Sequence, residues 1–270
     1  MPLPEHNPDL PDHINNSNQS PLADVAILLI GVTLLVVLFT FLLMSSARWL
    51  APFVPYQWER QLLASSGSGS QASAEARAMQ DLLERIVSQQ PEPLEITLHW
   101  LADEPTPNAF ATAGGHIFVS RGLLQQVQSE NGLAMVLAHE YAHIEARHPM
   151  SLMLEQMSLG AVLALLAGDA SAAVTGHASL LTLLSFSRDM EREADMRALA
   201  LLRSHYGHSR GADEFFRSMH KTDETPTRWQ AFLQTHPLTE EHIETIRQQS
   251  TAQPLPVKPL PAVLKAVREQ

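Results

Sequence analysis

Hydrophobic residues form one long run near the start of the chain and shorter, regularly spaced segments after it. Leu22 to Met44 carries one charge near its beginning and is otherwise dense in Leu, Val, Ile and Phe. About 20 apolar residues in a helix span the core of a lipid bilayer. The run therefore predicts a transmembrane helix over residues 21–45. Trp49, Tyr56 and Trp58 follow it, where an interfacial aromatic belt is expected.

The shorter segments predict strands as well as helices. Residues 72–89 have helical spacing, and residues 94–100 alternate apolar and polar positions as a strand does. Residues 108–113 and 116–120 flank Gly114-Gly115, which is the signal of a two-residue hairpin turn. We therefore expect a small antiparallel sheet in this half of the chain.

The second half of the chain is predicted to be helical from about Gly132 to residue 249. Within it, Met157–Ala167 and Leu180–Phe186 are apolar but shorter than a membrane span, and Gly168-Asp169 interrupts them. They predict buried core helices, with a hydrophobic hairpin that touches lipid as the alternative. The expected fold class is α+β, mainly helical, with the one N-terminal transmembrane helix.

Composition divides the rest of the chain into further segments. Residues 1–20 are rich in Pro and Asn and are expected to form a disordered tail. Residues 46–71 are expected to be a juxtamembrane linker, in which Ser and Gly between 65 and 70 predict a flexible tether. Residues 72–250 would form the main domain, and residues 251–270 a Pro-rich tail with a short helix.

Composition also excludes several classes of function. The chain has no cysteine, which rules out a cysteine-based zinc site, a disulfide framework and a cysteine nucleophile. Its formal net charge is −11, and it contains no basic block. Nucleic-acid binding is therefore not expected.

The run His139-Glu140-Tyr141-Ala142-His143 has the form H-E-x-x-H and lies in a predicted helix. Residues four apart lie on one face of a helix, so His139 and His143 can converge on one metal ion. Glu140 follows the first ligand, where its carboxylate can act as the general base of a zinc peptidase. The alternative interpretation is a pair of surface histidines.

A catalytic zinc site needs a third protein ligand and an open position. Glu191 and Asp195 lie four apart on a predicted helix. We expect Glu191 to bind the metal and Asp195 to accept a hydrogen bond from the ring N–H of a ligating histidine. Glu193 points elsewhere on the helix and is the weaker choice. The alternative is an ordinary charged helix face in which neighbouring arginines pair with these acids.

His148 suggests a different class of zinc peptidase, the metzincins. Their motif would require Gly at position 146 and His at position 149, where this chain has Ala146 and Pro149. The metzincin pattern is therefore excluded. His148 is instead expected at a helix end or on the surface.

Four motifs in the same order resemble a known family of zinc metallopeptidases, which includes the CAAX prenyl proteases and the HtpX-type membrane proteases. The resemblance extends from about Ala72 to about Gln249. It implies a zincin-like peptidase domain over residues 72–250 with one Zn²⁺ per chain. The family usually has Arg at the position of His242. The matching segments are His139–His148, Ser187–Asp195, Asn108–Leu124 and Thr235–His242.

The expected chemistry assigns a role to each candidate. Zn²⁺ would be held by His139, His143 and Glu191, and Glu140 would be the general base. His236, in the late Thr-His-Pro segment, is the candidate for a second donor to the oxyanion, or else an ordinary loop histidine. The backbone of Asn108, Ala109, Phe110, Ala111 and Thr112 could bind an extended peptide by strand addition, although Phe110 could equally be plain core.

These features predict a membrane-anchored zinc metalloendopeptidase that acts on membrane-associated or misfolded proteins. A single-pass protein of a bacterial inner membrane is expected. No Lys or Arg precedes the span, whereas Arg48 and Arg60 follow it, which favours a cytoplasmic catalytic domain. The alternatives are an inactive membrane-tethered chaperone or scaffold, and a zinc hydrolase with a non-peptide substrate. The oligomeric state is left open.

Overall fold

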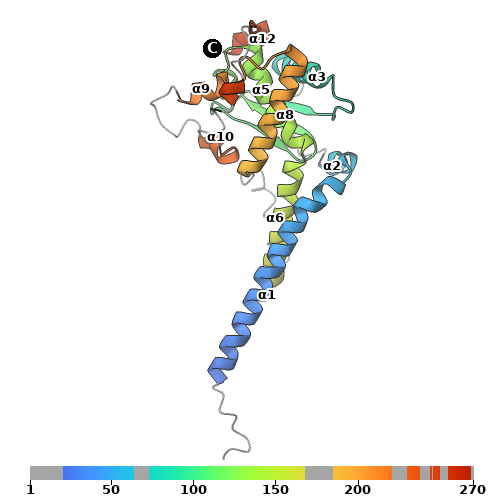
Figure 1. Cartoon of the computed structure of the whole chain (residues 1–270), viewed down its shortest axis with the longest axis vertical. Coiled ribbons are helices and arrows are strands. Elements are labelled where there is room, and N and C mark those ends of the chain that lie inside the picture. The colour runs from blue at the N-terminus through green and yellow to red at the C-terminus, as the bar shows by residue number, and fades with distance from the viewer. Residues whose placement is uncertain are drawn as a thin grey trace, which may run out of the picture.

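The computed structural model describes seven parts of the chain: residues 21–63, 73–167, 185–220, 230–237, 244, 246–249 and 255–268. The disordered tail expected before residue 21, the Ser/Gly tether, most of the apolar run 180–186, and His242 lie outside these described residues. A long helical rod projects from a mainly helical domain (Figure 1).

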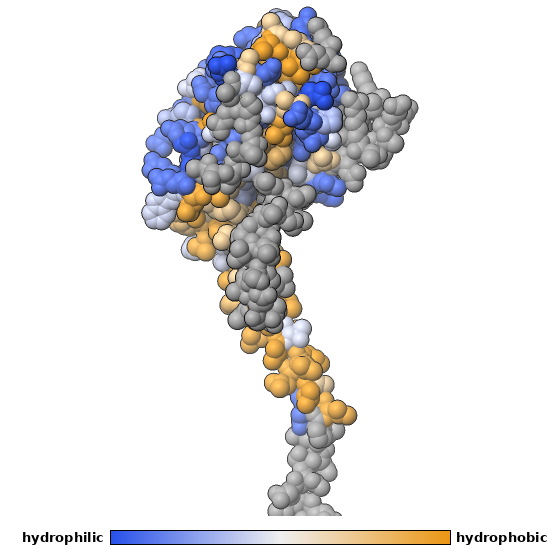
Figure 2. Space-filling view, turned by 180° about the vertical axis from the view of Figure 1, so that it is seen from behind, coloured by the Kyte–Doolittle hydropathy of each residue, from blue (hydrophilic) through white to orange (hydrophobic). Residues whose placement is uncertain are grey.

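The rod is α1 (Pro21–Leu50), which confirms the predicted apolar N-terminal helix. Its segment Leu22–Ser46, 25 residues long, is the one helix among the described residues found to be long and apolar enough to cross a membrane. Thr33 and Thr40 donate their hydroxyl hydrogens to carbonyls four residues earlier, each at 2.8 Å. Because these two hydroxyl groups are hydrogen-bonded within the helix, placing them in an apolar surrounding costs little free energy. Where the rod is coloured in Figure 2, its surface is predominantly hydrophobic.

A second helix, α6 (His148–Ala167), runs beside the upper part of α1 and packs against it (Figure 1). Met157 is 48% exposed and Leu159 is 40% exposed. The prediction of a buried core helix is therefore wrong for these two side chains, which face outward, whereas Val162 of the same segment is buried. The lipid-contact alternative fits, because apolar spacing alone does not distinguish a protein core from lipid as the surrounding medium.

The domain contains a three-stranded sheet in its described part, with the order β1-β3-β2. The strands are β1 (Thr97–Leu101), β2 (Ala109–Thr112) and β3 (His116–Ser120). β2 and β3 are antiparallel around Gly114 and Gly115, which have φ angles of +91° and +81°. β1 and β3 are parallel. The predicted antiparallel sheet is thus corrected to a mixed one, since the hairpin signal fixed only the β2–β3 pair.

Two helices, α3 (Ala74–Val87) and α5 (Glu130–Glu145), pack against this sheet, and a third, α8 (Arg188–Tyr206), packs against both of them. Each begins at a serine whose hydroxyl oxygen accepts a hydrogen bond from the backbone N–H three residues later, which satisfies a free donor of the first turn. These serines are Ser73, Ser129 and Ser187. Short helices α4 (Arg121–Leu124), α9 (Glu214–His220) and α10 (Gln230–Thr235) complete this part of the domain.

The helical region expected from about Gly132 is interrupted early, because α5 ends at Glu145. Arg147 adopts a left-handed conformation with φ of +64°, and α6 begins at the next residue. Such a conformation is uncommon for a residue other than glycine. The chain therefore turns sharply directly after the helix that carries the H-E-x-x-H motif.

The first part of the juxtamembrane linker is helical and docks on the domain. It contains η2 (Ala51–Phe53) and α2 (Tyr56–Leu63). Glu59 is 2% exposed; its Oε1 accepts the Gly114 N–H at 2.6 Å, and its Oε2 forms an ion pair with Arg147. Arg147 also donates to the Val54 carbonyl at 2.6 Å. This network joins the membrane-proximal segment to the hairpin turn and to the end of α5.

The C-terminal segment also packs into the domain. The Lys258 carbonyl accepts the Glu130 N–H at 2.9 Å, and the Lys258 N–H donates to the Asn131 side chain at 2.8 Å. The expected short helix is present as α12 (Ala262–Arg268), whose Leu264 and Val267 join the main hydrophobic core. The start of α5 is therefore held by residues from the far end of the chain.

Candidate metal centre

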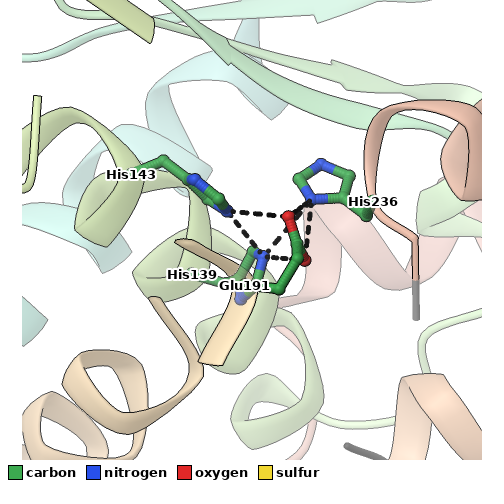
Figure 3. Close-up of side chains that lie close together, drawn as sticks. All are labelled: His139, His143, Glu191 and His236. Atoms are coloured by element: carbon green, nitrogen blue, oxygen red, sulfur yellow. Dashed lines mark hydrogen bonds and ion pairs between the residues drawn. The ribbon is translucent and has the colours of Figure 1, made fainter. Parts of the chain in front are cut away.

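α5 brings the two histidines of the motif onto one face, as its periodicity requires. His139 and His143 are buried, and their Nε2 atoms lie 3.0 Å apart (Figure 3). Phe186 stacks on the His143 ring with 3.8 Å between ring centroids. The two imidazoles thus converge in an interior site bordered by an aromatic side chain.

Glu191 reaches the same point from the first turn of α8, which packs against α5. Its Oε2 lies 3.4 Å from His139 Nε2, and its Oε1 lies 3.4 Å from His143 Nε2. Burial raises the pKa of Glu191, but His236 and His139 beside it outweigh burial and hold that pKa far below its usual range. Glu191 is therefore a buried carboxylate kept in its anionic form.

His236 follows α10 and completes a cluster of four donors. Its Nδ1 lies 3.1 Å from Glu191 Oε1 and 3.4 Å from His139 Nε2. One ligand atom from each of His139, His143, Glu191 and His236 lies within 4.8 Å of the others, and all four residues are buried. His236 is a candidate because it lies in the Thr-His-Pro segment, and the structure places the His236 ring in the cluster (Figure 3).

Glu140 lies beside the cluster and is fully buried. Its Oε1 is 3.4 Å from His236 Nε2, and neither oxygen has a hydrogen-bond partner among the described residues. Burial raises the pKa of Glu140. A buried carboxylate whose contact with His236 is this long can still accept a further hydrogen bond, for example from water.

Asp195 supports His139 from one turn further along α8. Its Oδ1 lies 3.0 Å from His139 Nδ1. Burial lowers the pKa of His139, but Asp195 and Glu191 outweigh it and hold that pKa well above its usual value. The Asp195 contact holds the proton on Nδ1, so the proton that a metal would displace is the one on Nε2, which faces the cluster.

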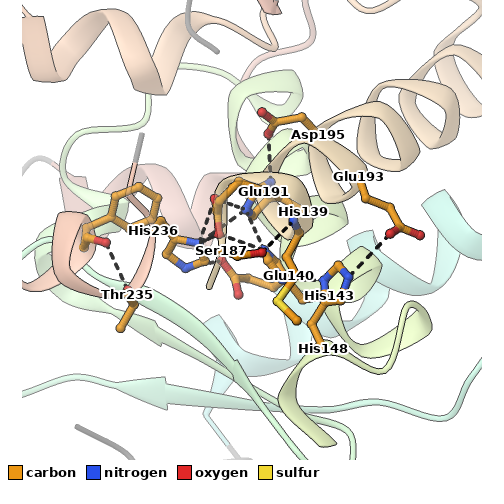
Figure 4. Close-up of polar contacts among 12 residues, drawn as sticks. His139, Glu140, His143, His148, Ser187, Glu191, Glu193, Asp195, Thr235 and His236 are labelled. Carbon is orange, nitrogen blue, oxygen red and sulfur yellow. Dashed lines mark hydrogen bonds and ion pairs between the residues drawn. The ribbon is translucent and has the colours of Figure 1, made fainter. Parts of the chain in front are cut away.

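The prediction of a surface position for His148 is wrong. His148 stands at the start of α6, as a helix-end residue, but it is only 5% exposed. Its Nδ1 lies 3.0 Å from His143 Nδ1, and its Nε2 lies 3.6 Å from Glu193 Oε2 (Figure 4). The sequence shows only that His148 follows His143 by five residues. In an unbroken helix that spacing would separate the two side chains, so the contact between them is not predicted.

The candidate peptide-binding residues lie on the edge of the sheet next to α5, which contacts β2. Within the described residues β2 pairs with β3 only. Ala109 and Ala111 are buried, Thr112 is nearly so, and the Phe110 ring stacks on Phe118 with 4.8 Å between ring centroids. The Asn108 N–H is held by Ser120 Oγ at 2.8 Å. Packing thus accounts for the Phe110 side chain, and in the described part of the chain no second strand pairs with β2.

The donor set fits a divalent metal ion. Once His139 gives up its Nε2 proton to a metal, its Nε2 lone pair faces His143 Nε2 at 3.0 Å, next to the buried Glu191 carboxylate. A cation between these atoms would relieve the close approach of the acceptors. Imidazole nitrogen with a single carboxylate is a ligand set of catalytic zinc sites.

Comparisons with known proteins agree with this geometry. The model of the family described as "Peptidase family M48" matches residues 73–250. A mitochondrial metalloendopeptidase OMA1 of Schizosaccharomyces pombe is 37% identical over 160 residues, which cover 57% of this chain and 47% of that protein. The OMA1 of Saccharomyces cerevisiae is 30% identical over 159 residues, which cover 54% and 45%.

A beta-barrel assembly-enhancing protease of Escherichia coli is 28% identical over 153 residues, which cover 52% of this chain and 31% of that protein. The chain therefore spans less than half the length of these curated relatives. Residues 73–250, which the family model matches, include the four residues that form the donor cluster.

Proposed function

The chain belongs to peptidase family M48, and on that premise we propose that it is a membrane-anchored zinc metalloendopeptidase. Its substrates would be membrane-associated or misfolded proteins. The observation that carries the proposal is the convergence of His139, His143, Glu191 and His236, with the buried Glu140 carboxylate beside them.

His139, His143 and Glu191 would hold one Zn²⁺ per chain. When bound, the ion supplies Lewis acidity, which polarises the scissile carbonyl and makes a neighbouring water a stronger acid. Asp195 keeps His139 in the tautomer that presents Nε2 to the cluster, through its 3.0 Å contact with Nδ1. The protein thus orients its ligands before a substrate arrives.

Glu140 would take the proton of the attacking water and deliver it to the nitrogen of the leaving amine. Its Oε1 lies 3.4 Å from His236 Nε2, a long contact that leaves the carboxylate able to accept the proton of that water. Glu140 then returns to its starting state when the amine leaves.

His236 would stabilise the oxyanion of the tetrahedral intermediate. Its Nδ1 faces Glu191, whereas its Nε2 lies 3.4 Å from Glu140 Oε1 on the side of the proposed water. An N–H at Nε2 is therefore the group that would donate to the oxyanion. Phe232 stacks on the His236 ring at 4.7 Å between ring centroids and limits its rotation.

An extended peptide would bind along the outer edge of β2, from Asn108 to Thr112. Strand addition uses backbone hydrogen bonds and tolerates varied side chains, which suits an enzyme that cleaves damaged proteins. α5 contacts β2, so a peptide on this edge would pass next to Glu140. The relatives named as proteases favour a protein substrate over another class of hydrolysed molecule.

α1 would anchor the enzyme in a bacterial inner membrane, with its domain on the cytoplasmic side because Arg48 and Arg60 follow the span. Reporter fusions at both termini test this orientation. A periplasmic signal from a C-terminal fusion would place the domain on the opposite face.

The deciding experiment is Glu140→Gln in the full-length protein in detergent. Cleavage of an unfolded protein substrate should stop, while zinc content stays near one per chain, because the amide that replaces the carboxylate can no longer accept a proton. Glu84→Gln, which neutralises an exposed carboxylate on α3, serves as the matched control and should remain active. Continued cleavage by Glu140→Gln would refute the assignment of the base.

The same experiment separates the alternatives. An inactive chaperone or scaffold would show no chelator-sensitive cleavage even in the unaltered protein. A zinc hydrolase with a non-peptide substrate would bind zinc and leave every protein substrate intact.

A further inference from the structure

We propose that His148 and Glu193 form a relay that positions His143 toward the metal, with a hydrogen bond between His148 and His143 and a longer contact between His148 and Glu193. His148 is therefore a positioning residue, and the inference rests on the proposed zinc site. Asp195 supports His139 in this way, and the relay would give comparable support to His143.

The tautomers follow from the ring contacts. His143 Nε2 faces the donor cluster, 3.0 Å from His139 Nε2 and 3.4 Å from Glu191 Oε1. The ring of a neutral His143 therefore carries its proton on Nδ1. The atom that can accept this proton is His148 Nδ1 at 3.0 Å. His148 must then carry its own proton on Nε2.

Glu193 is the acceptor at the outer end of the relay. Its Oε2 lies 3.6 Å from His148 Nε2. Arg197 holds Glu193 Oε1 with two contacts, at 2.8 Å and 3.1 Å, and also pairs with Glu145 at 2.7 Å (Figure 4 shows His148 and Glu193). The carboxylate is thus fixed on the side from which the His148 N–H approaches.

The backbone is arranged to bring His148 to this position. In an unbroken helix, a residue five positions after His143 would point about 140° away from it. The left-handed turn at Arg147 ends α5 and begins α6 at His148, which directs the imidazole back onto His143. An apolar residue would satisfy packing against Phe186 here, so a buried imidazole calls for a polar partner.

The two ligating histidines are therefore supported differently. His139 contacts the buried carboxylate of Asp195 directly, whereas His143 reaches a carboxylate only through His148. The Glu193 side chain is 47% exposed. Solvent screens an exposed carboxylate, so we expect His148 itself to contribute more to zinc affinity than Glu193 does.

The test measures the zinc dissociation constant of the full-length protein in detergent by competition with a chelator. His148→Leu removes the acceptor and keeps apolar bulk, and it should weaken zinc binding about 10–100-fold. His148→Gln retains an acceptor oxygen and should restore most of that loss. His205→Leu, a half-buried histidine on the far part of α8, is the matched control and should bind zinc as the unaltered protein does. Unchanged affinity in His148→Leu would overturn the proposal.

A second measurement needs no variant and so does not depend on the folding of His148→Leu. Nitrogen-15 NMR of the zinc-loaded protein should show a proton on Nδ1 of His143 and on Nε2 of His148. A proton on Nδ1 of His148 would overturn the relay. If the unaltered protein binds no zinc at all, the proposed function fails; an altered tautomer or unchanged affinity with zinc bound refutes the relay alone.

Discussion

Replacing Glu59 with alanine tests the link between helix α2 and the main domain. Glu59 is 2% exposed and contacts two parts of the domain at once, the Gly114 N–H and the Arg147 guanidinium. The Glu59→Ala variant leaves Arg147 without its carboxylate, in a position where its side chain is only 12% exposed. A charge that has lost its buried partner is strongly destabilising.

The size of the effect follows from what remains around Arg147. Breaking a buried ion pair by removing one partner costs about 3–5 kcal/mol. Arg147 keeps its bond to the Val54 carbonyl at 2.6 Å, so we expect the lower end, ~3 kcal/mol. At ~2–4 °C per kcal/mol for a domain of this size, the melting temperature should fall by ~6–12 °C.

The assay is thermal unfolding of the full-length protein in detergent, followed by circular dichroism. Glu95→Ala is the matched control, because Glu95 forms an ion pair with Arg60 of the same helix but its side chain is 77% exposed. An exposed pair contributes at most ~1 kcal/mol. The double variant Glu59→Ala/Arg147→Ala should be less destabilised than the sum of the single variants, since no unpaired charge remains. Strict additivity, or a Glu59→Ala melting point within ~2 °C of the original, would contradict the reasoning.

Three further outcomes are expected. Asp195→Asn should weaken zinc binding about 10–100-fold in a chelator competition, because the His139 Nδ1–H loses its carboxylate; unaltered affinity would show that the contact is incidental. Burial, and then His116, lower the pKa of His99 from 6.5 to about 4. The unfolded chain therefore takes up a proton between these values and the folded chain does not, so stability should fall as pH drops from 6.5 to 4. In the His99→Phe variant, the urea concentration at the unfolding midpoint should depend less on pH between 6.5 and 4. If that dependence is unchanged, groups other than His99 cause it. Leu159→Trp should add fluorescence that brominated lipid chains quench, whereas Arg77→Trp on exposed α3 should not be quenched.

Local chemistry explains which parts of the site the sequence predicts. The spacing of His139 and His143, and of Glu191 and Asp195, carries directly into three dimensions because a helix has a fixed period. That period places each pair on one face without knowledge of the rest of the fold. The transmembrane prediction depends likewise on length and composition within one segment.

The features that the sequence does not predict depend on distant partners. Arg147 adopts a left-handed φ where Glu59 and Val54, far away in sequence, bind its side chain. The position of His148 depends on that turn, so its contact with His143 has no local signal. Whether β1 runs parallel or antiparallel to β3 depends on the path of residues 102–108. The spacing of apolar residues within a strand does not predict that path.

The attachment of Lys258 beside the start of α5 has a consequence during synthesis. Asn131 and Lys258 are 127 residues apart in the chain. At about 5–20 residues per second, a ribosome needs ~6–25 s to make the second after the first. During that interval the H-E-x-x-H helix has been made, but the backbone that binds its first turn and the helix that closes its core have not. The domain would therefore complete its fold only after residues 258–268 have been made, which would delay the proposed proteolytic activity until then.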